Sequence, residues 1–137
     1  MSGNSLLLET EIFPDYGVII LEDVGTLDFP DGPFDEVLAS DHQVSVRTLP
    51  TDQAVAMGKN VHVKVFKGEE SAGLGKIVFD GKLTFTNPIL GVGQMLSDPE
   101  ELETIPLDRS GPVHLQIFVT PPTSATEVNI LIRYDLS

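Results

Sequence analysis

Apolar residues recur at every second position in several separate stretches of this chain. The clearest case is Val61, Val63 and Val65, which alternate with His62 and Lys64. Successive side chains of a β-strand point to opposite faces, so strict alternation predicts strands that are buried on one side. The pattern predicts eight strands, at residues 6–12, 16–21, 44–48, 61–65, 77–79, 83–85, 113–119 and 128–134.

Turn-forming residues separate these strands. Asp80-Gly81 stands between two of them and predicts a tight hairpin turn or a bulge. The glycines within 73–75 and 91–93 predict further turns or bulges. Regularly spaced short strands predict an all-β fold, and we expect a single-domain antiparallel β-sandwich of about seven to nine strands over residues 1–137.

One short helix is predicted between two later strands. Ser97-Asp98-Pro99-Glu100 has the form of a capping box, with Ser97 at the N-cap and Glu100 three residues later. The helix is expected to end near Glu103. It has one apolar interior residue, Leu102, so we expect a connector between strands and not a recognition helix.

The first 46 residues carry ten carboxylates and no Lys or Arg. Like charges held together destabilise a compact fold, so a block of this kind needs a reason. A solvated acidic surface is one explanation, and a surface that binds a basic partner is the other. The acids are Glu9, Glu11, Asp15, Glu22, Asp23, Asp28, Asp31, Asp35, Glu36 and Asp41.

Composition and motifs argue against several functions. With a net charge of −13, the chain is not expected to bind nucleic acid or anionic membranes, both of which require Lys and Arg. It has no cysteine, which excludes disulfides and thiolate metal sites. No apolar stretch approaches the roughly 20 residues of a membrane span, and neither a nucleophile elbow nor a phosphate loop is present. We therefore expect a cytoplasmic, non-enzymatic protein without a cofactor.

Residues 28–36 form the sharpest local feature, a predicted loop with four carboxylates and two phenylalanines. We assign partner binding to it: the carboxylates supply charge, and the phenylalanines act as apolar anchors, because buried aromatic residues dominate interface energies. A plain solvated loop and a calcium site are the alternatives, although the spacing does not match an EF-hand. The candidate residues are Asp28, Phe29, Asp31, Phe34, Asp35 and Glu36.

The histidines are the remaining candidate metal ligands. His62 and His114 stand at polar positions of predicted strands, where a cross-strand pair is one arrangement. A zinc site needs three or four converging ligands, and the third histidine, His42, or a carboxylate would have to complete it. Half-exposed strand positions are the simpler interpretation, and no metal is predicted.

Most of the chain can be described as one order of segments. An N-terminal strand pair precedes the acidic, Phe-bearing loop from Asp28 to Glu36. Then come Val44-Ser45-Val46-Arg47-Thr48, the valine strand at 61–65, a strand ending in Phe85-Thr86, and Ile105-Pro106-Leu107, which leads through Gly111 into 113–119. This order resembles the competence protein J family of small cytosolic nuclease inhibitors, and the resemblance implies binding and inhibition of a nuclease. It rests on pattern, without a signature residue.

We therefore predict a non-enzymatic, acidic protein-binding module: an inhibitor or immunity-type protein that occupies the basic site of a nuclease or of another cationic partner. A nuclease must present positive charge to hold phosphates, so a carboxylate-rich surface can occupy the same site. Two alternatives stay open. One is a structural module that assembles into homo-oligomers, and the other is a calcium-dependent, ligand-binding β-sandwich.

Overall fold

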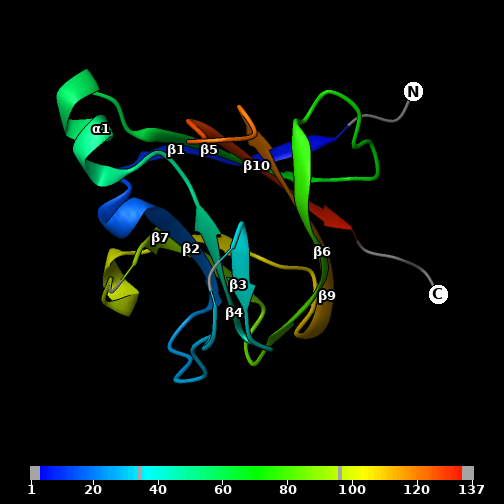
Figure 1. Ribbon diagram of the computed structural model, residues 1–137. Helices are drawn as coiled ribbons and strands as arrows, with labels where there is room; N and C mark the ends of the chain where they lie inside the picture. Colours follow the sequence, from blue (N-terminus) through cyan, green and yellow to red (C-terminus); the bar gives the residue numbers. More distant parts are fainter. Residues whose placement is uncertain (1–3, 34, 96, 134–137) are drawn as a thin grey trace.

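In the computed structural model, which describes residues 4–33, 35–95 and 97–133, ten strands form two five-stranded sheets (Figure 1). The first sheet has the strand order β1-β5-β10-β9-β6, and the second has the order β3-β4-β2-β7-β8. The first comprises β1 (Ser5–Ile12), β5 (Val61–Lys67), β10 (Glu127–Arg133), β9 (Gly111–Thr120) and β6 (Lys76–Phe85). The second comprises β3 (Val37–Ala39), β4 (Gln43–Arg47), β2 (Val18–Asp23), β7 (Ile89–Gln94) and β8 (Glu103–Pro106).

The two sheets bury their facing sides in one hydrophobic core. Alternate residues of each strand supply it: Ile130 and Ile132 of β10 in the first sheet, and Ile19 and Leu21 of β2 in the second. The predicted all-β sandwich is confirmed. The assignment of residues 1–137 to a single domain stays a prediction.

The strand count differs from the predicted seven to nine because three strands lack the alternating pattern. β3 has three residues and β8 has four, which is too short for a period to show. β7 carries Gly91 and Gly93 in its interior, where turns or bulges were predicted. The strands β5 and β10 pair in parallel, whereas an antiparallel sandwich was predicted. Alternation indicates which residues are buried and carries no information on strand direction, so the sequence could not show this pairing.

Of the two alternatives predicted for Asp80-Gly81, a tight hairpin turn or a bulge, the hairpin turn is wrong. These residues lie inside β6, a ten-residue strand that pairs with β9 from Lys76 to Phe85. Asp80 lies opposite Gln116 and Gly81 opposite Leu115, so the chain continues without turning. A register shift between Ile77 and Phe79 introduces an irregularity just before the dipeptide.

The helical segments also differ from the prediction. The α-helix is α1 (Thr51–Met57), at the upper left of Figure 1, and it ends at Gly58 in the left-handed conformation. It escaped the sequence analysis because Ala54 is its one buried residue. The predicted helix from Ser97 to Glu103 is instead a single 3₁₀ turn, η2 (Pro99–Glu101), and a second such turn, η1 (Asp15–Gly17), precedes β2. In the described part of the chain, no helix has the length and apolar character to cross a membrane.

The capping interaction at η2 lies one residue later than predicted. The Asp98 N–H donates to Glu101 Oε1 over 2.8 Å. This is the reciprocal half of a capping box with Asp98 at the N-cap. Ser97 precedes the cap and lines a cavity described below.

The predicted cross-strand pair of His62 and His114 does not form. β10 lies between β5, which carries His62, and β9, which carries His114. Each histidine instead contacts a carboxylate on the strand beside it: His62 Nε2 lies 2.6 Å from Glu9 Oε2, and His114 Nε2 contacts Asp80 Oδ1. Both are half-exposed strand positions, as the simpler interpretation held.

The contact with His114 lowers the pKa of Asp80 below its ordinary value of 3.8. The hydrogen bond from the His114 ring is the main cause, and Gln116 adds a further hydrogen bond to Oδ2 at 3.3 Å. Partial burial acts in the opposite direction. A carboxyl whose pKa is lower in the folded state stabilises the fold above its unfolded pKa and loses this contribution as the pH falls through the folded pKa.

We therefore expect Asp80→Asn to lower stability by less than about 1 kcal/mol at neutral pH, because the side chain is 52% exposed and water screens the contact. The difference in melting temperature between the wild type and the variant should persist down to about pH 5 and shrink below about pH 4. Thermal unfolding followed by circular dichroism across this range measures it. A difference that grows on acidification would contradict the assignment.

Candidate functional site

The described residues between β2 and β3, 24–33 and 35–36, form a long loop that lies over the outer face of the second sheet; we call it the acidic loop. Its sequence prevents a strand, because Gly25 and Gly32 have φ angles of 87° and 124° and two prolines cannot donate to a ladder. The acidic loop contains the predicted partner-binding residues. Its position therefore decides what those residues can reach.

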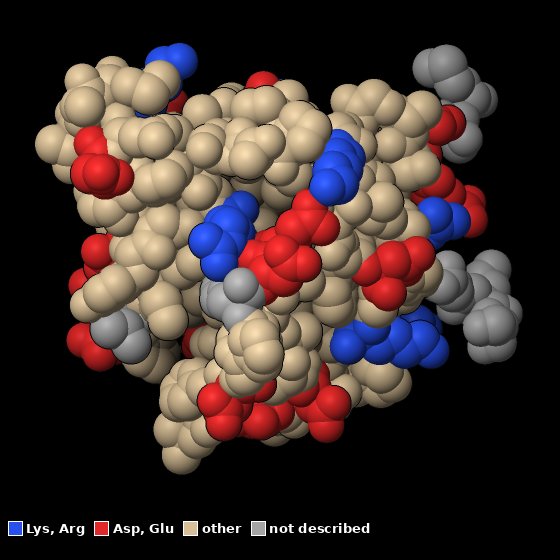
Figure 2. Space-filling model, viewed as in Figure 1, with Lys and Arg blue, Asp and Glu red and all other residues tan. Residues whose placement is uncertain are grey.

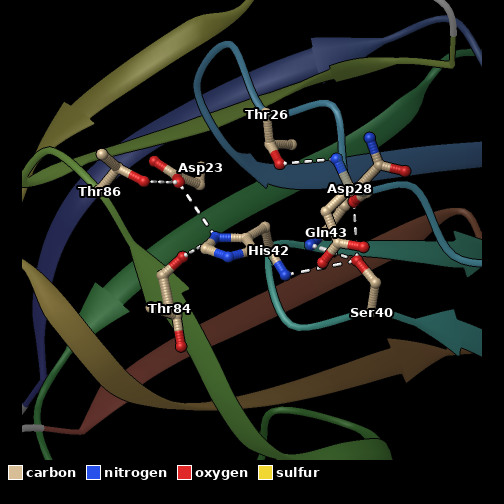
Figure 3. Close-up of polar contacts among 8 residues, drawn as sticks. All are labelled: Asp23, Thr26, Asp28, Ser40, His42, Gln43, Thr84 and Thr86. Carbon is tan, nitrogen blue, oxygen red and sulfur yellow. Dashed lines mark hydrogen bonds and ion pairs between the residues drawn. The ribbon is translucent and has the colours of Figure 1, made fainter.

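A buried carboxylate fixes the point where the acidic loop leaves β2 (Figure 3). Asp23 is 3% exposed, and its Oδ2 accepts a hydrogen bond from Thr86 Oγ1 at 2.8 Å and lies 3.1 Å from His42 Nδ1. The same nitrogen lies 2.8 Å from the Thr84 carbonyl oxygen. A carbonyl only accepts, so we assign the proton to Nδ1 of His42. Because Thr84 belongs to β6, this network joins the second sheet to the first.

The backbone of Asp28 is held from two sides (Figure 3). Its N–H donates to Thr26 Oγ1 at 3.0 Å, and its carbonyl accepts from Ser40 Oγ at 2.9 Å. Ser40 Oγ in turn accepts from the Gln43 N–H at 3.2 Å, at the start of β4. The first half of the acidic loop, which we define as residues 24–31, is therefore anchored through its main chain, and the side chain of Asp28 remains exposed.

The structure separates the predicted partner-binding residues into two groups. Asp28, Phe29 and Asp31 are exposed in the first half of the acidic loop. Asp35 and Glu36 lie in the second half, where Arg47 Nε donates to the Asp35 carbonyl at 2.7 Å and Lys76 Nζ lies 2.5 Å from Glu36 Oε2. Phe34 lies outside the described residues. Lys76 therefore offsets the charge of Glu36, whereas Arg47 contacts the main chain of Asp35, which is itself exposed.

The ten early carboxylates do not form one continuous negative surface. Glu9 and Glu11 lie on β1 in the first sheet, whereas Glu22 and Asp23 are buried in β2. In Figure 2, acidic side chains gather at the lower edge of the molecule, and others lie in the centre next to Lys or Arg. The exposed carboxylates of the acidic loop are therefore Asp28, Asp31 and Asp35, and Asp41 is exposed on the β3–β4 turn.

A cavity of about 360 Å³ lies between the acidic loop and the second sheet; we call it the loop cavity. Alternation in β2 directs Ile19 and Leu21 into the core, and this places Ile20 and Glu22 on the outer face, where they line the cavity. Glu22 is only 6% exposed, and its Oε1 accepts a hydrogen bond from Gln43 Nε2 at 2.8 Å. The lining residues are Ile20, Glu22, Phe29, Pro30, Leu38, Gln43, Ser45, Met95 and Ser97.

Two glycines of β7 allow Leu102, the residue after η2, to pack on the same outer face of the second sheet. A Cβ built on Gly93 would lie 2.6 Å from Leu102 Cδ2, and one on Gly91 would lie 2.8 Å from Leu102 Cδ1. Leu102 therefore packs directly on the strand. The acidic loop covers one part of this sheet face and the segment that carries Leu102 covers another. The loop cavity lies between these two segments, with β2 at its floor.

Sequence reasoning missed Glu22 and Gln43 as cavity residues, although one signal was present. The run Val18-Ile19-Ile20-Leu21 is continuously apolar, and such runs are typical of strands that are covered on both faces. Among the described residues, no three His, Asp or Glu side chains converge as a set of metal ligands. The acidic loop and the loop cavity are thus the features of this region that bear on binding.

Comparison with known proteins gives one informative match. No family model matches the chain, and no curated protein matches it in sequence. In three dimensions the chain is similar to ComJ from Bacillus subtilis, an inhibitor of the DNA-degrading activity of NucA, with a TM-score of 0.69 and 10% sequence identity. The match covers 96% of this chain and 98% of ComJ. The resemblance to the competence protein J family predicted from the sequence is thereby confirmed at the level of the fold.

Proposed function

We propose that this protein is a non-enzymatic inhibitor that binds a nuclease and covers its phosphate-binding surface with the acidic loop. The observation that carries the proposal is the full-length similarity of fold to a nuclease inhibitor. The anchored, exposed carboxylates of the loop supply the chemistry. Nucleases hold phosphates with positive charge, so exposed carboxylates at fixed positions compete for the same site.

The exposure of residues in the acidic loop supports a narrower surface for this role. Asp28 and Asp31 are exposed, and Phe29 between them is 57% exposed, an unusual position for a large aromatic side chain. Aromatic residues at the centre of an interface contribute most of its binding energy. We therefore assign the contact to the first half of the acidic loop, with the two aspartates steering the partner and Phe29 acting as the anchor.

Inhibition assays test the function itself. The purified chain is titrated into a NucA-type nuclease, and hydrolysis of a fluorescent DNA duplex is followed over time. We expect stoichiometric inhibition that weakens as ionic strength rises, because salt screens the attraction between exposed charges. Full nuclease activity in the presence of excess protein at low ionic strength would refute the inhibitor role against that class of nuclease.

Paired variants test the role of the acidic loop. Asp28→Asn combined with Asp31→Asn should slow association with the nuclease by roughly tenfold at low ionic strength, because removal of charge at the rim of an interface acts mainly on the association rate. Glu69→Gln combined with Glu127→Gln is the matched control, since it removes two exposed carboxylates outside the acidic loop. Stopped-flow kinetics measure both. Equal association rates for the two double variants would remove the loop from the interface.

A further inference from the structure

We propose that the loop cavity binds one arginine side chain of the protein partner. The inference deepens the proposed function, on which it rests for the existence of a partner. It is argued, however, from the chemistry of the cavity, and that chemistry can be tested without a nuclease.

The Glu22 carboxylate is the charged group that lines the loop cavity. It is 6% exposed, it lines the cavity, and it takes part in none of the ion pairs between described residues. Gln43 satisfies Oε1, but a carboxylate accepts about four hydrogen bonds. A buried carboxylate without a cation is costly, and pairing with an incoming cation offsets that cost.

Much of the remaining cavity wall is apolar. Ile20, Leu38 and Met95 line the cavity together with the ring of Phe29. An arginine buries its three methylenes against apolar surface while its guanidinium reaches a charged partner. The exposed Phe29 ring also offers a face on which a guanidinium stacks favourably. At about 360 Å³ the cavity stands at the lower end of the roughly 300–1,000 Å³ typical of ligand pockets, which suits a single side chain.

The choice of arginine over lysine follows from the number of acceptors. Besides Glu22, the cavity is lined by Gln43, Ser45 and Ser97, each of which carries an oxygen that can accept. A guanidinium presents five N–H donors in a planar fork, whereas an ammonium presents three around one point charge. Arginine therefore matches a wide set of acceptors around one carboxylate better than lysine does.

Nuclear magnetic resonance with small probes tests the cavity directly. Nα-acetyl-arginine methylamide is titrated into the isotope-labelled protein, with the citrulline analogue as an isosteric neutral control. The arginine probe should produce saturable shifts at the Gln43 side-chain amide and at Ile20 and Ser45, with binding at least about tenfold weaker for citrulline, since a hydrogen bond to a charged group contributes that much. The lysine analogue should bind more weakly than arginine. Equal binding of arginine and citrulline would overturn the proposal.

Two variants tie the effect to the cavity. Glu22→Gln keeps an acceptor for Gln43 and removes the charge, so the arginine probe should bind about tenfold more weakly. Phe29→Ala removes a wall side chain that is 57% exposed and should also weaken binding. Glu127→Gln, which makes the same chemical change as Glu22→Gln on an exposed strand residue, should bind like the wild type. Unchanged binding in both cavity variants would refute the site.

The outcomes separate the two proposals. If the arginine probe binds as expected but the chain inhibits no nuclease, the cavity assignment stands and the proposed function fails. If the chain inhibits a nuclease but the probes bind equally, the proposed function stands and the cavity assignment fails.

Discussion

Replacement of Phe85 by alanine is expected to lower the free energy of unfolding by about 3–5 kcal/mol, the range found for removal of a buried aromatic side chain. Phe85 is 1% exposed and is the largest of the fully buried side chains. It ends β6, directly after Thr84, whose carbonyl accepts from His42. The cavity left by the ring would therefore form in the core next to the contact that joins the two sheets.

Chemical denaturation followed by circular dichroism measures this effect. Phe29→Ala is the matched control, because it makes the same truncation at a side chain that is 57% exposed. We expect the control to change stability by less than about 1 kcal/mol, as is usual for surface substitutions. Similar losses in the two variants would contradict the position of Phe85 in the core.

Replacement of Asp23 by alanine should cost about 2–3 kcal/mol, the second-largest effect that we predict. The change removes the acceptor for Thr86 Oγ1 and leaves His42 with the Thr84 carbonyl as its remaining acceptor in this network. Buried polar groups that lose a partner retain the full cost of their desolvation. Asp23 Oδ1 is buried without a hydrogen-bond partner among the described residues, and removal of that atom offsets part of the loss.

The Asp23 variant should also loosen the acidic loop, because Asp23 is the last residue before it. Hydrogen exchange at the Asp28 amide reports this, since that N–H is held by Thr26. Asp41→Ala removes an exposed carboxylate on the neighbouring turn and serves as the control, for which we expect little change in either stability or exchange. If the Asp28 amide exchanged equally fast in the two variants, the Asp23 network would have no role in holding the loop.

The sequence predicted part of the candidate site, and the acidic loop shows which part. Four carboxylates and two phenylalanines in nine residues predicted an exposed loop with partner-binding chemistry, and the first half of it is exposed in the structure. The charge pattern could not show that Lys76 reaches Glu36 from 40 residues away in the chain. It also could not show that Glu22 faces a cavity, because burial of the outer face of β2 depends on segments far along the chain.

By itself the sequence determined the class of fold and most of its strands, since the alternation of apolar and polar residues is a local consequence of strand geometry. It also determined that exposed carboxylates would stand in the loop after β2. Only the tertiary structure decided the parallel pairing of β5 with β10, the continuity of β6 through Asp80-Gly81, and the division of the early acids between buried, paired and exposed positions. Strand pairing and charge neutralisation arise between residues that are distant in the chain, and no local pattern encodes which of them will meet.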